Sequence, residues 1–333
     1  MKVVYINRNQ RPEAFSIERV FGFVRTWVAA KGGIEIINFS HNPSRGLLSQ
    51  IFELRGHKAD VYHITGDVHY YAPFLPHNKV VLTIHDIGHY THTLKGLRKI
   101  IYRLLWLELP IRFSTIITVV SEDTKSNILK YFAVSKEKIV TIGNPIDPGV
   151  KFVSKVFNEN CPVILQVGSK DYKNVPRLVE ALRGIKCKLI IIGKLDGQTL
   201  HKLKENSVQY ENYFNITDEE LRRHYNACDL VSFVSTGEGF GVPIIEANAV
   251  GRPIITSNIP PMSDVAGAAA CLVNPLDVQD IRRGVSRIIN DRSYRENLVE
   301  AGKKNCLRFT PEKIAGEHIA MYLELQRRAE GSK

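Results

Sequence analysis

Two glutamates flank a glycine-rich turn in the second half of the chain. Glu238 precedes Gly239 and Gly241, and Glu246 follows eight residues after Glu238. Glycines let a backbone turn sharply and expose its N–H groups, which bind anions such as phosphate. A carboxylate accepts hydrogen bonds from a vicinal diol such as that of a ribose. The combination suits a ligand that carries both a phosphate and a sugar, as a nucleotide does.

The flanking residues predict a strand before this turn and a helix after it. Leu230–Val234 is an apolar run of strand length. Pro243 suits the first helical position, where its missing N–H costs nothing, and Gly251 followed by Pro253 marks the helix end. The turn therefore lies at a helix N-terminus, whose dipole adds partial positive charge to the exposed amides.

Strands and helices alternate along the rest of the chain. The first half has strands at 3–6, 35–39, 61–64, 80–84, 115–119 and 139–142, with helices at about 16–31, 47–56, 95–112 and 122–132. The second half adds strands at 163–167, 188–192, 253–256 and 270–273 and helices near 277–290, 292–307 and 311–329. This alternation predicts parallel sheets with helices on both faces. Ligands of such sheets bind beyond the carboxyl ends of the strands.

The composition is that of a globular chain with a basic excess. A length of 333 residues favours two domains. Of the net charge of +11, residues 1–150 contribute most, with 19 Lys and Arg against 12 Asp and Glu. This excess suits an acidic partner such as an anionic membrane surface, a phosphorylated lipid or a nucleic acid. A merely basic surface explains the charge equally well.

The cysteines and the N-terminus favour a cytoplasmic protein. The five cysteines lie in the second half without any C-x-x-C pair, a pattern that predicts reduced, buried thiols. Residues 1–8 are predicted to begin the first strand rather than a signal peptide. No run reaches the ~18 apolar residues of a membrane-spanning helix.

The segment 238–247, E-G-F-G-V-P-I-I-E-A, resembles the Glu-x7-Glu signature of retaining GT-B glycosyltransferases of family 4. The continuations G-R-P-I-I-T-S at 251–257 and D-V-A-G at 264–267 follow the same pattern. The resemblance implies a GT-B fold, an α/β architecture of two doubly wound Rossmann-like domains facing across a cleft. It implies an acceptor-side domain at 1–155, a nucleotide-sugar-binding domain at 156–310, and a C-terminal helix, 311–333, that crosses back to the first domain.

The resemblance also assigns residues to the donor site. His85, Glu238 and Lys173 are implied as catalytic: His85 and Glu238 hold the sugar, and Lys173 meets the diphosphate. The residues implied to bind the nucleotide sugar are Ser169, Lys173, Gly239, Phe240, Gly241, Val242 and Glu246. Ser169 stands where the family commonly has an arginine, so binding of the donor diphosphate is weaker or depends on other residues. A core histidine at 85 and a surface lysine at 173 are the alternatives.

The loop after the first strand departs from the family pattern, because it lacks the usual pair of glycines. Arg8, Arg11 and Arg19 are candidates to supply charge in place of backbone amides, and a solvated basic loop is the equal alternative. Asp86, next to His85, is a further loop or acceptor candidate.

Histidines are dense between His57 and His92, where seven occur. A zinc site needs four converging ligands, and this half of the chain has no cysteine. Together with the resemblance, which implies that no metal and no cofactor is needed, this favours the hypothesis that no metal is bound.

The segment 94–113 is apolar, basic and contains a tryptophan, a composition typical of a helix at a membrane surface. Its spacing also suits an ordinary core helix with a basic outer face, which we favour slightly. The rival is contact with an anionic membrane.

The resulting hypothesis is a retaining, metal-independent hexosyltransferase in the synthesis of surface polysaccharide or lipopolysaccharide. It takes a nucleotide sugar, with GDP-mannose favoured, and a glycan or lipid-linked acceptor, in the cytoplasm or at the inner face of the plasma membrane. Transfer of glucose or N-acetylhexosamine from UDP or another carrier, and a sugar-nucleotide epimerase of the same fold, are the alternatives. A nucleic-acid partner is disfavoured, because no known binding module is evident. A glycoside hydrolase is disfavoured too, because no carboxylate pair of the hydrolase kind is evident.

Overall fold

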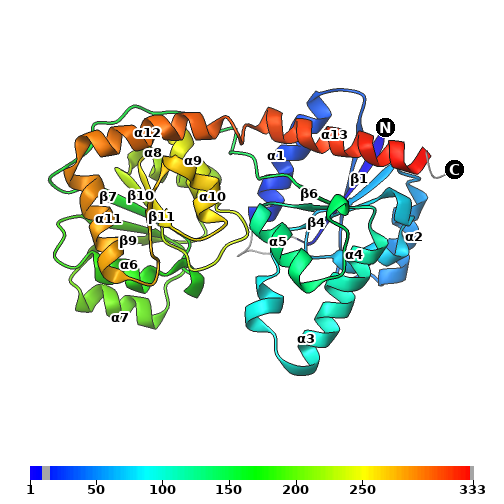
Figure 1. Cartoon of the computed structure of the whole chain (residues 1–333), viewed down its shortest axis with the longest axis horizontal. Coiled ribbons are helices and arrows are strands. Elements are labelled where there is room, and N and C mark those ends of the chain that lie inside the picture. The colour runs from blue at the N-terminus through cyan, green and yellow to red at the C-terminus, as the bar shows by residue number, and fades with distance from the viewer. Residues whose placement is uncertain (10–15, 331–333) are drawn as a thin grey trace. The chain divides into compact units, whose positions relative to one another are not determined.

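The computed structural model describes residues 1–9 and 16–330, and the chain divides into two compact units (Figure 1). Unit 1 comprises Met1–Pro145 together with Pro311–Lys333, and unit 2 comprises Ile146–Thr310. Unit 1 is thus discontinuous in sequence, and unit 2 is one continuous stretch. Arg11, one of the candidates for the first loop, lies outside the described residues.

Unit 1 contains a six-stranded parallel sheet in the order β2-β1-β3-β4-β5-β6. Its strands are β1 (Lys2–Asn7), β2 (Glu35–Ser40), β3 (Val61–Ile64), β4 (Val80–Ile84), β5 (Ile116–Val119) and β6 (Ile139–Thr141). Its helices are α1 (Ser16–Ala30), α2 (Leu47–Gly56), the 3₁₀ helices η1 (His69–Phe74), η2 (His77–Lys79) and η5 (Lys136–Lys138), the π-helical turn η3 (His89–Thr93), α3 (Gly96–Tyr102), the π-helical η4 (Arg103–Glu108), α4 (Leu109–Phe113), α5 (Glu122–Tyr131) and α13 (Pro311–Glu330).

The two faces of this sheet differ in polarity, because successive strand residues point to opposite faces. One face carries Val4, Ile6, Ile64, Leu82 and Ile84 into an apolar core that α2, α4 and α5 complete. The other face carries Tyr5, His63, Thr83 and Thr118, and the helices α1 and α13, which pack on each other, cover the polar side chains of this face.

A hydrogen-bond chain ties α13 to the sheet. The Tyr322 hydroxyl donates to the Tyr5 hydroxyl at 2.7 Å and lies 2.7 Å from Nδ1 of His63. Since that hydroxyl has used its proton, His63 Nδ1 donates to it, and Nε2 accepts from Thr83 Oγ1 at 2.7 Å. Buried polar groups need such partners, so the last helix is fixed to the first and third strands of the chain.

Unit 2 contains a second six-stranded parallel sheet in the order β12-β11-β10-β7-β8-β9. Its strands are β7 (Val163–Val167), β8 (Lys188–Ile192), β9 (Gln209–Tyr213), β10 (Leu230–Phe233), β11 (Ile254–Ser257) and β12 (Cys271–Val273). Its helices are the 3₁₀ helices η6 (Asp171–Lys173) and η7 (Gly267–Ala269), α6 (Val175–Ala181), α7 (Gly197–Glu205), α8 (Asp218–Ala227), α9 (Val242–Val250), α10 (Met262–Ala266), α11 (Val278–Asn290) and α12 (Arg292–Cys306). In chain order this is the Rossmann strand order, 3-2-1-4-5-6 read from the other edge.

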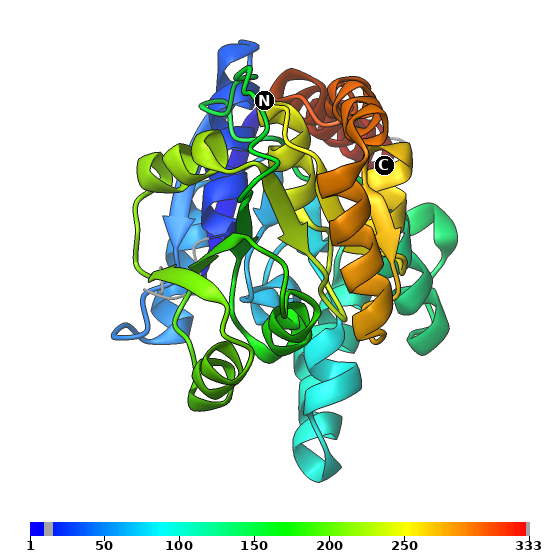
Figure 2. The same ribbon diagram turned by 90° about the vertical axis from the view of Figure 1, so that its left-hand side faces the viewer.

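Helices cover both faces of this second sheet (Figures 1 and 2). α6 packs against α7 and α11 on one face, and α9 packs against α8, α10 and α12 on the other. Except for the edge strand β9, the strands between them are almost continuously apolar, as expected of a sheet buried on both sides.

Three sequence expectations need correction. The row of aliphatic side chains in 94–113 lies at the surface rather than in the core, and the helix is interrupted by the π-helical η4. Two of the five free cysteines, Cys161 and Cys306, are only partly buried. α7 and β9 lie in a stretch for which no helix or strand was predicted.

Candidate functional site

The predicted donor residues of unit 2 lie where the strand order of its sheet reverses. From β7 the chain adds β8 and β9 on one side, then returns to add β10 on the other. The loops after β7 and β10 therefore diverge at the carboxyl edge of the sheet, which is where ligands of doubly wound sheets bind. Ser169 and Lys173 come from the first loop, and Glu238 to Val242 come from the second.

Lys173 and Glu238 meet between these loops. Lys173 Nζ lies 2.7 Å from Glu238 Oε1, and both side chains are mostly buried, with exposed fractions of 14% and 13%. The Lys173 ammonium also lies 4.5 Å from the ring centroid of Phe233, at a distance typical of a cation–π contact. The stem of Lys173 crosses Gly168, where a Cβ would come within 2.7 Å of its Cε. Only glycine leaves room for this path.

Asn174 fastens the two loops together. Its backbone is left-handed, at φ 60°, and its buried side-chain amide donates to the carbonyls of Val234 at 3.0 Å and Pro275 at 2.7 Å. The amide of Thr236 donates to the carbonyl of Tyr172 at 2.8 Å. Asn174 was not among the predicted site residues, because its burial and its left-handed backbone are visible only in the structure.

The glycine turn leads directly into α9. Gly241 has φ 111°, and a Cβ there would lie 2.9 Å from the Ile244 side chain, so this turn requires glycine. Phe240 is buried against Phe309, with ring centroids 5.5 Å apart. Val242 begins the helix, and Glu246 lies one turn inside it with 2% of its surface exposed. A carboxylate so buried has a structural or binding task, because burial of an ionised group is costly.

Ser169 points toward the next strand. Its hydroxyl donates to the carbonyl of Lys194 at 2.7 Å, and a Cβ on Gly193 would meet its oxygen at 2.4 Å. Ser169 therefore connects the loops after β7 and β8.

The predicted residues of unit 1 lie at the carboxyl edge of its own sheet. That sheet reverses between β1 and β3, and His85 follows the adjacent β4. His85 Nε2 lies 2.9 Å from the carbonyl of Thr65, and a carbonyl can only accept, so Nε2 carries a proton. Burial lowers the pKa of His85, opposed by the Thr65 hydrogen bond and by Asp86. The neutral ring then offers Nδ1 as a hydrogen-bond acceptor.

The basic residues near the first loop are engaged by neighbouring side chains. The Arg8 guanidinium pairs with the carboxylate of Glu18, with Nη2 3.2 Å from Oε2. The guanidinium of Arg19 lies 5.7 Å from the centroid of the Phe23 ring. Asp86 is exposed and accepts from the amide of Gly88 at 2.8 Å, so it shapes the turn after His85.

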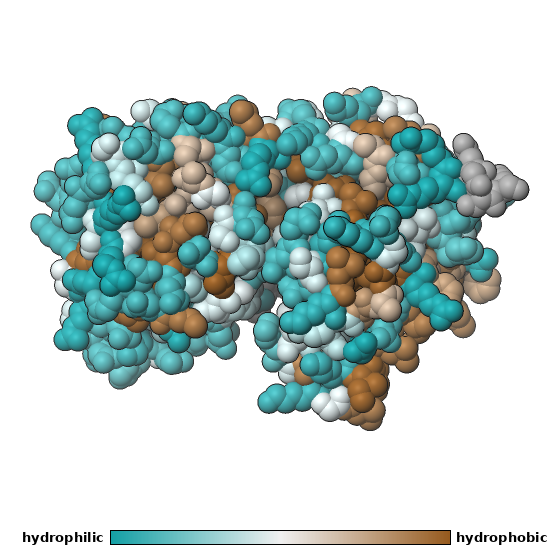
Figure 3. Space-filling view, in the orientation of Figure 1, coloured by the Kyte–Doolittle hydropathy of each residue, from teal (hydrophilic) through white to brown (hydrophobic). Residues whose placement is uncertain are grey.

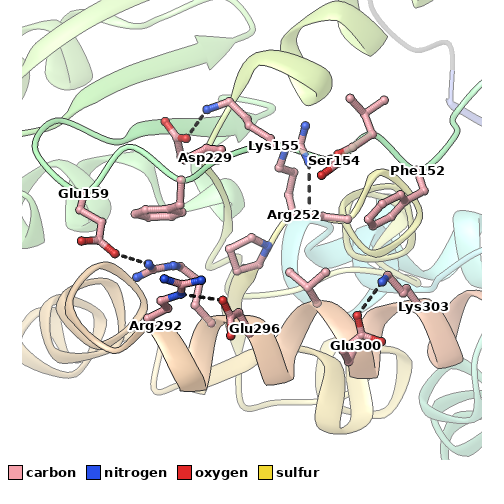
Figure 4. Close-up of a pocket in the computed structure, with 17 residues that line it drawn as sticks. Phe152, Ser154, Lys155, Glu159, Asp229, Arg252, Arg292, Glu296, Glu300 and Lys303 are labelled. Carbon is pink, nitrogen blue, oxygen red and sulfur yellow. Dashed lines mark hydrogen bonds and ion pairs between the residues drawn. The ribbon is translucent and has the colours of Figure 1, made fainter.

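A separate cavity of about 410 Å³ lies in unit 2 and contains none of the predicted donor residues. It lies between the strap 152–159, the loop at Gly251 to Pro253, and α12 (Figure 4). Its charged side chains pair with one another, as Lys155 does with Asp229 and Arg295 with Glu159. These pairs hold the strap on unit 2.

Within residues 1–9 and 16–330, no cluster of three or more histidine, cysteine or carboxylate side chains is arranged to hold a metal ion. Over the same residues no helix has the length and apolar character needed to cross a membrane.

Models of known families match both halves of the chain. The model described as Glycosyltransferase Family 4 matches residues 9–150, and the model described as Glycosyl transferases group 1 matches residues 150–305.

Two curated glycosyltransferases match most of the chain at modest sequence identity, and a solved structure matches its fold. O-antigen chain mannosyltransferase B of Escherichia coli is 26% identical over 306 residues, covering 82% of this chain and 76% of that protein. The capsular polysaccharide biosynthesis glycosyltransferase CapM of Staphylococcus aureus is 28% identical over 274 residues, covering 72% and 69%. The crystal structure of HepE from Anabaena in complex with UDP and glucose matches with a TM-score of 0.76 at 16% identity, covering 97% and 99% of the two chains.

Proposed function

The chain belongs to the family 4 glycosyltransferases, as its matches to the two family models show. We propose that it transfers a hexosyl unit from a nucleotide-diphosphate sugar to a glycan or lipid-linked acceptor. The proposed transfer retains the configuration at the sugar carbon. The chain's two doubly wound sheets are those of the GT-B fold. The proposed product is a surface polysaccharide or lipopolysaccharide, as the names of the E. coli and S. aureus relatives suggest.

The observation that carries this proposal is the meeting of Lys173 and Glu238 at the reversal point of the second sheet, directly before α9. A diphosphate placed at the N-terminus of α9 would meet backbone amides of the glycine turn, the helix dipole and the Lys173 ammonium. These groups favour the negative charge that grows on the departing diphosphate as the bond from the sugar carbon to the phosphate oxygen breaks.

The remaining residues are proposed to hold the sugar and the nucleoside. Glu246 accepts from the ribose hydroxyls, and Glu238 accepts from hydroxyls of the transferred sugar. In unit 1, His85 Nδ1, left as an acceptor because Nε2 donates to Thr65, is proposed to accept from a substrate hydroxyl. The acceptor oxygen then bonds to the sugar carbon on the face that the diphosphate leaves, the bond from that carbon to the diphosphate oxygen breaks, and the departing diphosphate oxygen takes the proton of the acceptor hydroxyl. No metal ion takes part in the proposed step.

The name of the E. coli relative, a mannosyltransferase, favours a mannosyl unit, and we propose GDP-mannose as its donor. UDP-glucose, which occupies one of the HepE crystal structures, is the competing donor. We therefore propose a comparison of GDP-mannose with UDP-glucose and UDP-N-acetylglucosamine by thermal shift, because a saturating ligand raises the unfolding temperature.

The test of the site is Glu246→Ala, with Glu246→Gln as the variant that keeps the side-chain volume. Each removes a charged acceptor for the ribose, so donor affinity should fall by roughly 10- to 100-fold. Titration calorimetry with the donor chosen by thermal shift measures this loss. Glu219→Ala, at an exposed position of α8, is the matched control and should bind like the unsubstituted chain.

The site assignment fails if both Glu246 variants fold and bind the donor with unchanged affinity. If donor is bound and isomerised without any acceptor being used, the epimerase alternative replaces transfer.

A further inference from the structure

The helical arm formed by α3 and η4, residues 96–108, presents an aliphatic stripe to solvent. Its five members are Leu97, Ile100, Ile101, Leu104 and Leu105, with exposed fractions of 70%, 63%, 46%, 46% and 41%. They follow a spacing of i, i+3, i+4, i+7 and i+8, which places them on one helix face. Figure 3 shows apolar surface gathered on the projecting part of unit 1 where α3 lies.

The opposite face of the arm is already committed to unit 1. Tyr102 stacks on Trp106 with centroids 5.7 Å apart and an interplanar angle of 11°. Trp106 in turn packs on Tyr70 at 5.3 Å, and Tyr102 packs on His89 at 5.2 Å. Leu107 is buried in the core. These contacts fix the orientation of the arm, so the stripe cannot turn inward without breaking them.

The charge around the stripe is almost wholly positive. Between residues 94 and 113 the basic side chains are Lys95, Arg98, Lys99, Arg103 and Arg112, and the single acid is Glu108. Glu108 is paired with Arg103, whose Nε lies 2.7 Å from its Oε1. Lys95, Arg98 and Arg112 are exposed. Within residues 94–113 the stripe is therefore accompanied by an excess of positive charge, and the nearby exposed acids are Asp67 and Asp86, which act on Tyr102 on the other face of the arm.

We propose that this arm binds the surface of an anionic lipid bilayer, with the aliphatic stripe inserted among the acyl chains at the interface and the lysines and arginines at the phosphates. An apolar row with basic neighbours is the composition of helices that lie in the membrane interface. An aliphatic surface of this kind on a soluble chain marks an interaction site, and the positive charge selects an anionic bilayer over a neutral one. The proposal does not depend on which sugar is transferred.

The first experiment is co-sedimentation of the full chain with vesicles. Vesicles of phosphatidylcholine mixed with phosphatidylglycerol should bind the chain, and vesicles of phosphatidylcholine alone should bind it much more weakly. Added salt should weaken the binding, because surface charges are screened. Equal, weak binding to both vesicle types overturns the proposal.

The second experiment removes the stripe with Leu97→Ser, Ile100→Ser and Leu104→Ser together. Binding to the anionic vesicles should fall by about tenfold or more, since each side chain loses its apolar transfer. The matched control replaces three exposed leucines of unit 2, Leu200, Leu276 and Leu307, with serine; their exposed fractions are 45%, 63% and 68%. Equal binding by the stripe variant and this control overturns the proposal.

The third experiment reverses charge with Lys95→Glu and Arg98→Glu. The control, Lys31→Glu and Lys136→Glu, makes the same change in net charge at exposed positions of the same unit. The arm variant should lose its preference for anionic vesicles by about 30-fold or more, since it loses two basic residues that each contribute about 1 kcal/mol at a membrane surface, and the control should retain most of that preference. All four positions are exposed, so circular dichroism should show unchanged folding.

A second copy of the chain is the competing occupant of the stripe. Light scattering across a range of protein concentrations tests it. Dimers that the serine variant abolishes, combined with no binding to anionic vesicles, would assign the stripe to self-association and overturn the membrane proposal.

Discussion

At the scale of single residues, Lys173 is the side chain whose surroundings say most about its task. It reaches across Gly168, lies against the Phe233 ring and contacts Glu238. Surface ion pairs contribute little to stability, but this pair is largely shielded from solvent and lies at the point where a doubly wound sheet binds ligands. The position of Lys173 is explained better by binding to a negatively charged ligand than by a contribution to the stability of the fold.

Replacing Lys173 with alanine should therefore lower kcat/KM for the nucleotide sugar by about 100-fold. A charge-assisted contact is worth about 1.5 to 3 kcal/mol, and each 1.4 kcal/mol is a factor of ten in rate. The loss would be increased by Glu238, which would face the diphosphate without its cationic partner. Steady-state kinetics with the preferred donor measure the effect.

Lys204→Ala, at an exposed position of α7, is the control and should leave the kinetics unchanged. A Lys173→Ala protein with the kinetics of the control would remove Lys173 from the site.

Residues that follow buried strands could be found in the sequence, but their partners could not. Lys173 and Glu238 are 65 positions apart, and their contact depends on β7 and β10 being neighbours. Asn174 was missed because its role depends on a left-handed backbone that no pattern around it requires. The roles proposed for His85 and Glu246 remain predictions.

At the scale of elements, the C-terminal helix α13 is held to the first sheet by polar as well as apolar contacts. Tyr322 is fully buried and joins His63 to Tyr5. Tyr322→Phe keeps the ring but removes the hydroxyl, leaving His63 Nδ1 buried without this partner.

That substitution should lower the free energy of unfolding by about 1 to 3 kcal/mol, the usual cost of a buried polar group left unsatisfied. Urea unfolding followed by circular dichroism measures it. Tyr210→Phe, at an exposed position of β9 (39%), should change the free energy of unfolding by less than about 0.5 kcal/mol. Equal effects of the two substitutions would contradict the role of the Tyr322 hydroxyl.

The same layer predicts sensitivity to acid. Burial lowers the pKa of His318 to about 3, and burial, together with the nearby His318 and His85, lowers the pKa of His63 well below its usual value. The pKa in the folded state is thus below the unfolded value of about 6.5, so protons bind the unfolded chain first. Stability conferred by these histidines is present above about pH 6.5 and is lost as the pH falls.

Between about pH 6.5 and 5, each such histidine should add up to about 1.4 kcal/mol per pH unit to the loss in free energy of unfolding. The other titratable groups of this layer are His85, Tyr5, Tyr322 and Arg25. Urea unfolding at several pH values measures the slope. His318→Phe should reduce the slope of the free energy of unfolding against pH by the equivalent of about one bound proton. His201→Phe, at an exposed position, should leave the slope unchanged. An unchanged slope in the first variant would contradict this origin.

Core elements were predicted well from the sequence, and marginal ones were not. Buried strands such as β3 and β4 carry apolar runs and have the predicted bounds. β9, Gln209–Tyr213, is an edge strand whose side chains are exposed or only partly buried. Its sequence therefore has no apolar run from which a strand could be predicted. The prediction that the apolar face of 96–108 lies in the core was wrong for another reason. A helical period shows that an apolar face exists but not whether the protein covers it.

At the scale of the whole molecule, the chain contains one continuous and one discontinuous unit. The GT-B fold that the family resemblance implied is confirmed. The alternation of strands and helices by itself predicted the parallel sheets with helices on both faces. The order of the strands was not predicted, since the alternation alone does not specify on which side of the sheet a strand is added. Unit 2 has its own apolar core, built from residues between Phe157 and Leu298.

This organisation predicts different behaviour for two fragments. Residues 146–310 alone should unfold cooperatively in urea, because their core and sheet need nothing from the rest of the chain. Residues 1–145 alone lack α13, which covers Tyr5 and His63, and should show no cooperative transition or should aggregate. Circular dichroism and size-exclusion chromatography separate these outcomes.

The intact chain serves as the reference for both fragments. A fragment 1–145 as stable as unit 1 in the intact chain would show that α13 is dispensable.

The discontinuity of unit 1 also sets an order of events during synthesis. The first 145 residues leave the ribosome long before Pro311–Glu330, because the 165 residues of unit 2 are made in between. At about 5 to 20 residues per second, the nascent unit 1 waits roughly 10 to 30 s with the face that bears Tyr5 and His63 covered by α1 but not yet by α13. Unit 2, begun second, is therefore the first to be complete, and the early half of the chain stays incomplete for longer.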